Sequence, residues 1–200
     1  MIFSNIKSNL EKKGYTVSCF ETSKEACEYL KSEIKDKTVG IGGSMTVKEI
    51  GLYDVLSESN DVVWHWVVPD GETADSMRAK ARNTEIYISS ANGISETGEI
   101  INIDGGCNRV AETMYGHKKV YFIVGSNKIE PDYEKALYRA RNIAAPLNAK
   151  RFNLSTPCVK GGKCFDCSSP QRICRGLGVF WTKPSCFDCE IVIINEKLGF

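Results

Sequence analysis

Residues 38–52, TVGIGGSMTVKEIGL, contain a short apolar strand pattern at 38–42, a glycine-rich turn, and a helical pattern that begins at about Thr46. Farther along the chain, apolar strand patterns recur at 61–68, 85–89 and 120–125, and helical patterns separate them. Such alternation is typical of a mainly parallel sheet covered by helices. We therefore predict an α/β fold with helices on both faces, in which these four strands are neighbours.

The two ends of the chain extend this pattern. Ile2, Ile6 and Leu10 have the spacing of one helical face, and apolar strand patterns lie at 15–20 and 190–195. We assign residues 1–200 to a single domain. It has a core at 1–147, a segment rich in Cys, Gly, Pro and Ser at 148–189, and a closing strand at 190–200.

One pair of strand patterns is expected to depart from the parallel arrangement. Only nine residues, SANGISETG, separate 85–89 from 99–103. A parallel crossover needs about a dozen residues or more. We therefore predict that these two strands form an antiparallel pair.

The composition limits the class of partner. The chain is 42% hydrophobic and 26% charged, with a formal net charge of +1. This balance argues against a strong electrostatic field for nucleic acid or a membrane surface. No apolar run is long enough to span a bilayer, and the first residues lack the shape of a signal peptide. We expect a cytoplasmic protein that binds neither nucleic acid nor membranes.

Polar residues follow several of the strand patterns, where open α/β sheets bind ligands. Arg109 could bind a carboxylate through a bidentate pair of hydrogen bonds, and Glu96 or Asp104 could act as a general base. The same sequences are also ordinary turn sequences, which is the alternative interpretation. The predicted ligand-binding residues are Gly42, Gly43, Ser44, Asn92, Glu96, Asp104, Asn108 and Arg109.

Three other polar residues receive simpler interpretations. His65 lies inside an apolar strand pattern between two tryptophans, which favours a buried, hydrogen-bonded histidine. His117 lies in a polar Gly-His-Lys-Lys turn and is expected to be exposed. Asn127 and Lys128 follow the strand at 120–125 and could reach the same edge, but Lys128 is expected to be a solvated surface charge.

Six of the nine cysteines lie between residues 158 and 189. Thiols clustered in a protein of the reducing cytosol indicate metal or redox chemistry. One possible set is Cys158, Cys164, Cys167 and Cys174, which suits an iron–sulfur cluster or a closed zinc site. A second set, Cys164, Cys167, Cys186 and Cys189, has the spacing of a structural zinc site. Unligated thiols are the third interpretation.

Six collinear segments carry a resemblance that covers nearly the whole chain. The sequence is similar to the short stand-alone members of the lactate-utilisation (LUD) domain family. The resemblance implies a fold like that of ribose-5-phosphate isomerase, glucosamine-6-phosphate deaminase and the coenzyme A transferases. The segments are VGIGGSMTVKEIGL at 39–52, SSANGISETGEIINIDGGCNRVAE at 89–112, VYFIVGSNKI at 120–129, ARNIAAPLNAKR at 140–151, TPCVKGGKCFDCSSPQRIC at 156–174 and the closing NEKLGF at 195–200.

The resemblance also implies an association with bacterial oxidation of lactate to pyruvate. It favours the 158–174 cysteine set and a [4Fe–4S] cluster, with zinc as the alternative. Three functions stay open. The chain is an electron-transfer or auxiliary component that binds a small carboxylate such as lactate or pyruvate, beside an iron–sulfur or flavin redox protein. Alternatively, it is an independent isomerase-like or CoA-transferase-like enzyme for a small acid or sugar phosphate, or a binding module with a structural zinc. Family analogy further suggests a homodimer.

Overall fold

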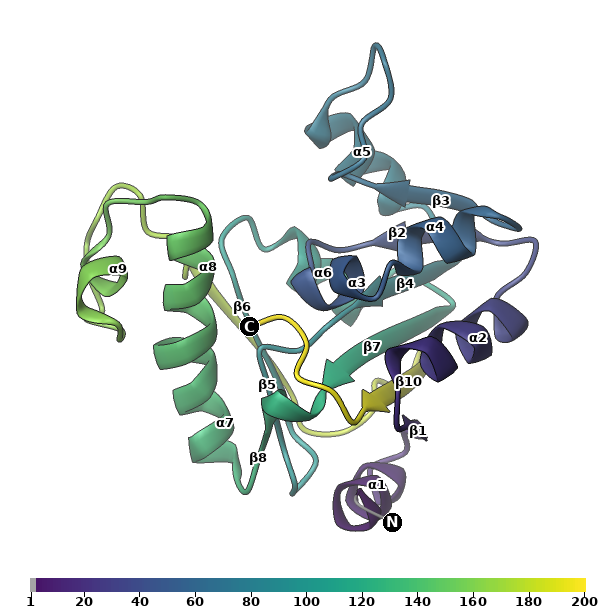
Figure 1. Cartoon of the computed structure of the whole chain (residues 1–200), viewed down its shortest axis with the longest axis horizontal. Coiled ribbons are helices and arrows are strands. Elements are labelled where there is room, and N and C mark those ends of the chain that lie inside the picture. Colours follow the sequence, from purple (N-terminus) through teal and green to yellow (C-terminus); the bar gives the residue numbers. More distant parts are fainter. Residues whose placement is uncertain (1–2) are drawn as a thin grey trace.

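A six-stranded, entirely parallel sheet forms the centre of the molecule, in the order β1-β10-β7-β4-β2-β3 (Figure 1). The computed structural model describes residues 3–200, so Ile2 of the predicted N-terminal helix lies outside the described residues. The four strands that were expected to be neighbours are β7, β4, β2 and β3, which confirms that prediction. The six strands are β1 (Thr16–Phe20), β2 (Thr38–Ile41), β3 (Asp61–Trp64), β4 (Ile86–Ser89), β7 (Lys119–Gly125) and β10 (Asp188–Ile194).

Helices cover both faces of this sheet because successive strand residues point to opposite sides. In β7, Ile123 packs in one hydrophobic cluster with Leu30 of α2, whereas Phe122 packs in the other with Leu10 of α1. The apolar residues Val120–Val124 of β7 are almost fully buried, as predicted. Helices α2 (Ser23–Glu33), α3 (Met45–Glu49) and α4 (Leu52–Ser57) cover one face, and α1 (Ser4–Lys12) and α5 (Ala74–Ala81) contribute to the other.

A second, four-stranded sheet lies against the α1 side of the first, in the order β8-β5-β6-β9. The predicted antiparallel pairing of 85–89 with 99–103 is wrong. β4 stays in the parallel sheet, and β6 pairs instead with β5, which forms inside the connecting loop. The pairing is possible because Gly98 has φ +98° in the tight turn between β5 and β6. The strands are β5 (Gly93–Ser95), β6 (Ile100–Asp104), β8 (Ile129–Glu130) and β9 (Gly176–Phe180).

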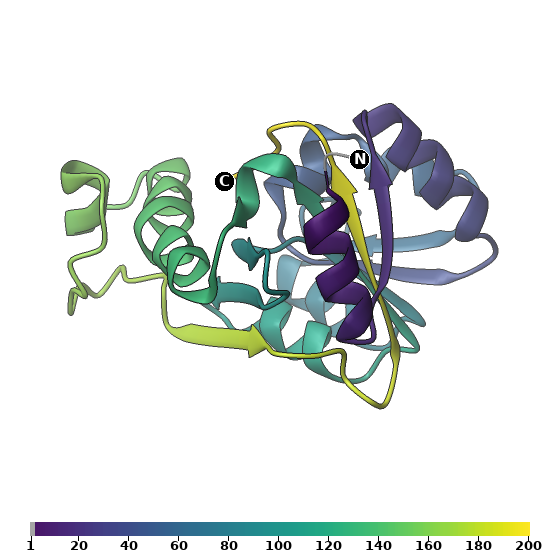
Figure 2. The same ribbon diagram turned by 90° about the horizontal axis from the view of Figure 1, so that it is seen from below.

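A nearly continuous helix runs past the end predicted for it at about residue 145. It consists of α7 (Tyr133–Arg139), a π-helical turn at Ala140–Ala144, and α8 (Ala145–Arg151). The wider π turn ends two residues before Pro146, which has no N–H to donate to an α-helical hydrogen bond. Figure 2 shows the helix that ends in α8 beside the two sheets, with the short α9 (Pro157–Gly161) and the neighbouring loops of the cysteine-rich segment beyond it.

The remaining helix, α6 (Asn108–Met114), packs against β4, β6 and β9. It helps to bury His117, and this overturns the expectation of an exposed side chain. The His117 ring is stacked on Tyr87, and its two nitrogens contact the Thr84 carbonyl oxygen at 2.7 Å and Glu112 Oε2 at 3.2 Å. The polar turn sequence was therefore misleading, because partners distant in sequence satisfy the ring.

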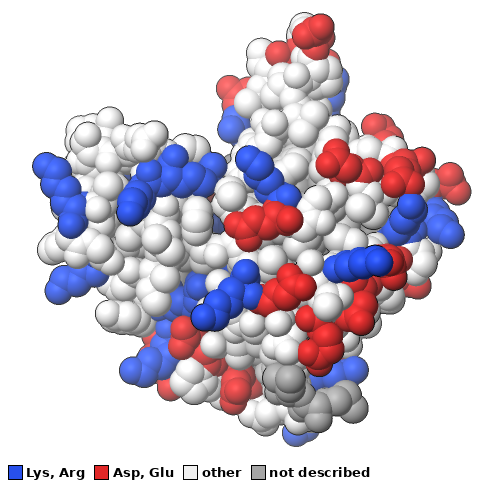
Figure 3. All heavy atoms as spheres, in the orientation of Figure 1, with Lys and Arg blue, Asp and Glu red and all other residues white. Residues whose placement is uncertain are grey.

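None of the helices formed by residues 3–200 combines the length and apolar character that crossing a lipid bilayer requires. On the face shown in Figure 3, acidic and basic side chains are intermixed. This mixture agrees with the net charge of +1.

Candidate functional site

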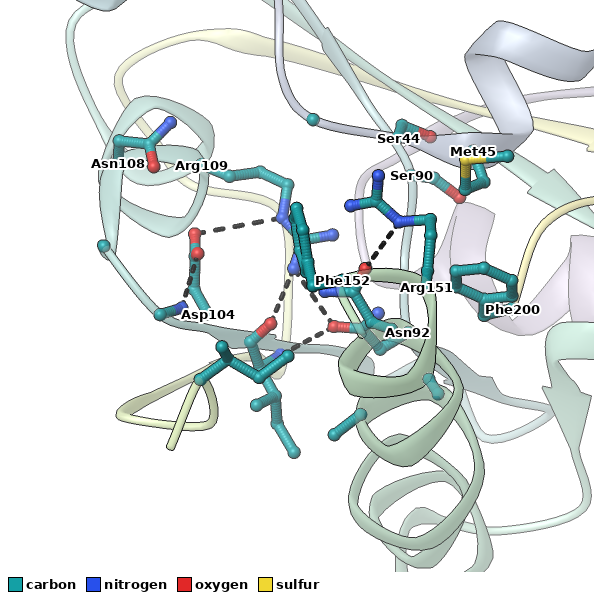
Figure 4. A pocket seen from close by; sticks show the side chains of 18 of the residues that line it. Ser44, Met45, Ser90, Asn92, Asp104, Asn108, Arg109, Arg151, Phe152 and Phe200 are labelled. Atoms are coloured by element: carbon teal, nitrogen blue, oxygen red, sulfur yellow. Dashed lines mark hydrogen bonds and ion pairs between the residues drawn. The ribbon is translucent and has the colours of Figure 1, made fainter. Parts of the chain in front are cut away.

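A cavity of about 370 Å³ lies where four of the parallel strands end. Ser44 lines it just after β2, His65 just after β3, Asn92 just after β4 and Lys128 just after β7. The opposite wall comes from the end of β6, from the beginning of α6, from α8, and from part of the cysteine-rich segment (Figure 4). We call this space the main cavity. Its position agrees with the place where open α/β sheets bind ligands.

The structure brings most of the predicted ligand-binding residues to the main cavity. Gly42 lies just behind the wall, and a Cβ there would be 2.9 Å from the Tyr87 hydroxyl and 3.1 Å from Cγ of Arg109. The absent side chain therefore makes room for the arginine. The predicted residues that line the cavity are Gly43, Ser44, Asn92, Asp104, Asn108 and Arg109.

Glu96 is not at the main cavity, which corrects the prediction. Strand β5 carries the chain away from Asn92 and towards α1 before Glu96 is reached. There Oε2 of Glu96 accepts a hydrogen bond from Asn5, and its carbonyl oxygen accepts one from Asn9. Asn92 in the first part of the polar loop reaches the cavity, whereas residues 93–98 form a strand and a turn of the second sheet.

Ser44 caps the helix that follows the glycine turn. Its hydroxyl accepts a hydrogen bond of 3.2 Å from the N–H of Val47, and α3 has only five residues. Such capping satisfies one of the free N–H groups at the start of a helix. The glycine turn therefore shapes the wall of the main cavity. The short α3 adds only a weak helix dipole there.

Arg109 is held mainly by the protein itself. Its Nη2 donates to the Ile103 carbonyl oxygen at 2.6 Å and to Asn92 Oδ1 at 3.2 Å, and Nε lies 3.8 Å from Asp104 Oδ2. Asp104 in turn accepts hydrogen bonds from the N–H groups of Gly105 and Val110. Figure 4 shows this network at one side of the cavity. Arg109 and Asp104 thus hold the loop after β6 in place, and part of the predicted anion clamp is already occupied.

Arg151 is a cavity residue that the sequence interpretation missed. Its guanidinium lies over the rings of Trp66 and Phe152, with Cζ 5.0 Å and 3.9 Å from their centroids. Nε donates to Asn148 Oδ1, and within residues 3–200 its terminal nitrogens make no hydrogen bond to protein. Burial lowers the pKa of this guanidinium. The helical spacing of Ala144, Asn148 and Arg151 could have shown that these residues share one face, had the helix not been ended at about 145.

The side chains around the main cavity carry an excess of positive charge. Asp104 is the only Asp or Glu that lines it in the described part of the chain. Such a concave cationic surface attracts anions. The basic side chains that line it are Arg78, Arg109, Lys128, Arg151, Arg172 and Arg175.

Lys128 is buried, which corrects the expectation of a solvated surface charge. Only 3% of the residue is exposed, and Nζ donates to Thr46 Oγ1 at 2.7 Å and to Ser90 Oγ at 2.9 Å. Burial, and then the nearby Arg139 and Arg109, lower the pKa of Lys128 to about 7. A substantial fraction of this amine is therefore neutral at physiological pH.

His65 also lines the main cavity, but from a turn. Strand β3 ends at Trp64, so the predicted strand at 61–68 is too long. Burial and the positive charge of Arg78 lower the pKa of His65 to about 4, against the opposing effect of Asp104. The imidazole is consequently neutral at pH 7, and it can offer a hydrogen bond without adding charge.

A smaller pocket between α8, α9 and the loops of the cysteine-rich segment is lined by Cys158, Cys164, Cys167 and Cys174. We call it the cysteine pocket. Neither Cys186 nor Cys189 lines it. Cys189 is in β10 within the core, where burial raises the pKa of its thiol to about 12, and Cys186 is exposed. The structure thus groups the 158–174 set and separates it from the two cysteines of the zinc-spaced alternative.

The surroundings of the cysteine pocket suit thiolates. The N–H of Asp166 donates to Cys164 Sγ at 3.4 Å, and Arg141 Nη2 donates to the same sulfur at 3.7 Å. Hydrogen bonds to sulfur are among the contacts that tune thiolate-ligated centres. Within residues 3–200, however, no three His, Cys, Asp or Glu side chains are grouped closely enough to hold a metal ion. The donor set fits a thiolate-ligated group, but the sulfur positions are not those of a closed ligand sphere.

The main cavity and the cysteine pocket share part of a wall. Ala145, Arg172 and Ile173 line both. Arg172 and Ile173 belong to the cysteine-rich segment, and Ala145 begins α8. A group bound in one pocket would therefore be a near neighbour of a group bound in the other.

Comparison with known proteins agrees with this architecture. The sequence matches the LUD domain family model over residues 4–180. The chain belongs to the LUD domain family. This membership supports a role related to lactate utilisation. The matched range includes all four residues of the cysteine pocket and ends before Cys186.

One solved structure similar to this LUD protein is a DUF162 family protein from Deinococcus radiodurans, with a TM-score of 0.56 and 10% sequence identity. The alignment covers 96% of each chain, so the likeness in fold extends over the whole molecule. No curated protein matches the sequence significantly. The likeness in fold to ribose-5-phosphate isomerase and related enzymes stays a prediction.

Proposed function

We propose that this LUD protein binds a small carboxylate such as lactate or pyruvate in the main cavity and acts as an electron-transfer component of lactate oxidation. Its thiolate-ligated centre would be a [4Fe–4S] cluster held by Cys158, Cys164, Cys167 and Cys174. The observation that carries this proposal is the wall of Ala145, Arg172 and Ile173 between the two pockets. It supports short-range communication between a bound acid and a redox centre.

The charges of the main cavity support the first half of the proposal. Arg151 has free terminal nitrogens over the aromatic rings of Trp66 and Phe152, and a guanidinium can bind a carboxylate through two parallel hydrogen bonds. His65 is neutral at pH 7 and can contact the hydroxyl or carbonyl of the acid. A cavity of about 370 Å³ has ample room for a three-carbon acid and ordered water.

The chemistry of lactate oxidation explains why a partner is part of the proposal. Conversion of lactate to pyruvate releases two electrons and two protons. A [4Fe–4S] cluster supplies one-electron carriage, so the reaction also needs an iron–sulfur or flavin redox protein. Among residues 3–200, Asp104 is the Asp or Glu side chain that lines the main cavity, and it is the candidate proton acceptor from this chain.

Two alternatives keep support from specific observations. The excess of arginines over carboxylates around the main cavity also suits a sugar phosphate, as an independent isomerase-like or CoA-transferase-like enzyme would bind. Four thiols around one pocket also suit a structural zinc, which would make the chain a binding module. Homodimer formation stays a prediction.

The test uses wild-type protein purified without oxygen. Its iron, sulfide and zinc contents are measured, and lactate and pyruvate are titrated by calorimetry. We expect iron and sulfide in equal amounts, and we expect Arg151→Met to weaken carboxylate affinity about tenfold or more because a charge-assisted pair is lost. Lys150→Met is the matched control, since Lys150 is exposed on the same helix and does not line the main cavity.

The possible results separate the candidates. Zinc without iron contradicts the electron-transfer function and supports the binding module. Binding of a sugar phosphate in preference to lactate and pyruvate supports the independent enzyme. Equal carboxylate affinity for wild type and Arg151→Met would show that the acid binds elsewhere.

A further inference from the structure

Lys128 is placed like a reactive amine. It ends the 3₁₀ turn Ser126–Lys128 directly after β7, and its side chain reaches the wall of the main cavity. Its Nζ is bonded to the hydroxyl groups of Thr46 and Ser90. Among the ion pairs of residues 3–200, Arg109 and Arg139 near Lys128 each have a carboxylate partner, and Lys128 has none. Burying an ammonium group ordinarily requires such a partner.

The groups around Lys128 disfavour an ammonium ion. Arg139 from α7 and Arg109 from α6 repel a positive charge on Nζ, and Glu49 at the end of α3 opposes them weakly. Both arginines are held in place by hydrogen bonds to backbone carbonyl groups of the protein. Lys128 is therefore an amine whose neutral form is accessible at pH 7.

We propose that Lys128 forms an imine with the carbonyl carbon of a 2-oxo acid or small aldehyde bound in the main cavity. The proposal rests on the proposed function only in that the cavity accepts a small carboxylate. It adds a covalent activity and narrows the reactive ligands to those with a carbonyl group. Lactate, which has a hydroxyl in that position, would bind without reacting.

The reaction balances with groups that are present. The lone pair of Nζ attacks the carbonyl carbon, a C–N bond forms, and the carbonyl oxygen takes up the proton that nitrogen loses. The resulting carbinolamine takes up one proton from solvent on its hydroxyl oxygen and loses water as the C–O bond breaks, which leaves a protonated imine. No oxidant or reductant is consumed.

Two neighbours of Nζ support these steps. The Ser90 hydroxyl lies 2.9 Å from Nζ, and its contacts to Thr46 and Ala91 are long, at 3.3 Å and 3.5 Å. It is therefore free to turn and to pass a proton to the departing oxygen. The terminal nitrogens of Arg151 could hold the carboxylate of the same ligand, because both side chains line the main cavity.

Reductive trapping tests the proposal on the full-length protein. Pyruvate and cyanoborohydride are added, and intact-mass measurement with peptide mapping locates any adduct. We expect a single 1-carboxyethyl group on Lys128 in the wild type, and none with lactate. Lys128→Arg keeps a cation but cannot form the imine, so it should show no adduct. Lys118→Arg, which changes an exposed lysine, should react like the wild type.

The pH dependence of trapping gives an independent readout. At saturating pyruvate, modification should rise as pH increases through about 7, whereas an ordinary lysine has a pKa near 10.4. A rise only above pH 9, or adducts spread over surface lysines, would overturn the proposal.

A neutral probe separates this proposal from the proposed function. Propionaldehyde carries no carboxylate, so its trapping on Lys128 would support the amine's reactivity even if calorimetry detects no lactate or pyruvate binding. If pyruvate binds by calorimetry and neither probe is trapped on Lys128, the imine proposal fails and the carboxylate site stands. If neither acid binds and neither probe is trapped, both proposals fail.

Discussion

Arg172 Nη1 donates a hydrogen bond of 2.8 Å to the carbonyl oxygen of Cys167, while the same side chain lines the main cavity. Its Nε makes a second bond of 2.8 Å, to the carbonyl oxygen of Cys174. One arginine thus connects the backbone of two cysteine-pocket residues to the wall of the proposed carboxylate site. Changes in either pocket should therefore be detectable in the other.

Arg172→Met should loosen the cysteine-rich segment. The substitution removes the bonds to Cys167 and Cys174, so we expect faster hydrogen exchange in residues 163–175 and faster alkylation of Cys167. Both are measured by mass spectrometry on metal-free protein. Lys160→Met, which alters an exposed charge on α9, is the control. Unchanged exchange in the arginine variant would mean that the segment is ordered by other contacts.

Cys167→Ser should lose the bound metal, and Cys186→Ser should keep it. Cys167 lines the cysteine pocket, whereas Cys186 is exposed and does not. Metal binding at a thiolate site contributes to folding, so the first variant should also loosen residues 155–175. Metal content and hydrogen exchange measure the two effects. Loss of metal in both variants would favour the zinc-spaced set.

Lys128→Met should increase stability most at neutral and acidic pH. The folded pKa of about 7 lies below the unfolded value near 10.4, so the unfolded chain binds more protons between these values. The free energy of unfolding of the wild type therefore rises, through this group, as pH increases from 7 to 10. The advantage of the variant should be on the order of a few kcal/mol at pH 7 and should shrink towards pH 10. Urea unfolding at several pH values measures it, and a constant difference would contradict the assignment.

Arg109→Met should destabilise the fold as well as weaken carboxylate binding. It leaves the Ile103 carbonyl and the Asn92 side chain without their charged donor, at a cost of about 1–3 kcal/mol. Arg151→Met removes one side-chain hydrogen bond and the contact of the guanidinium with the rings of Trp66 and Phe152, but it leaves no backbone carbonyl without its donor, so it should affect stability less. Denaturant unfolding together with calorimetry compares the two roles. If Arg109→Met keeps full stability but loses carboxylate binding, the role of Arg109 is to bind the anion and not to hold the loop.

Most of the main sheet could be predicted because its information is local. The apolar runs that became β2, β4 and β7 are bounded by turn residues, and alternation with helices is visible along the chain. The pairing of β6 was not predictable from spacing, because β5 has only three residues and no independent strand pattern. Close approach of α7 to Gly93, where a Cβ would lie 2.5 Å from the Ala136 carbonyl oxygen, helps to select that pairing.

The candidate site divides in the same way. The residues that follow strand ends, such as Ser44, Asn92 and Asp104, could be predicted because parallel strands end at a common edge. Glu96 was misplaced because an unrecognised strand carries it away from that edge. Arg151 was missed because it reaches the cavity only where α8 packs beside the sheet. The burial of Lys128 was missed because it depends on contacts with α3 and α7.

The sequence alone determined the α/β class, the positions of the main strands along the chain and the concentration of thiols at 158–174, since these depend on residues near one another in the chain. Only the tertiary structure decided that Lys128 is buried beside Thr46 and Ser90 and that Arg172 connects the two pockets. The physical reason is that desolvation and hydrogen-bond satisfaction depend on every group packed around an atom. Those neighbours come from elements far apart in the sequence.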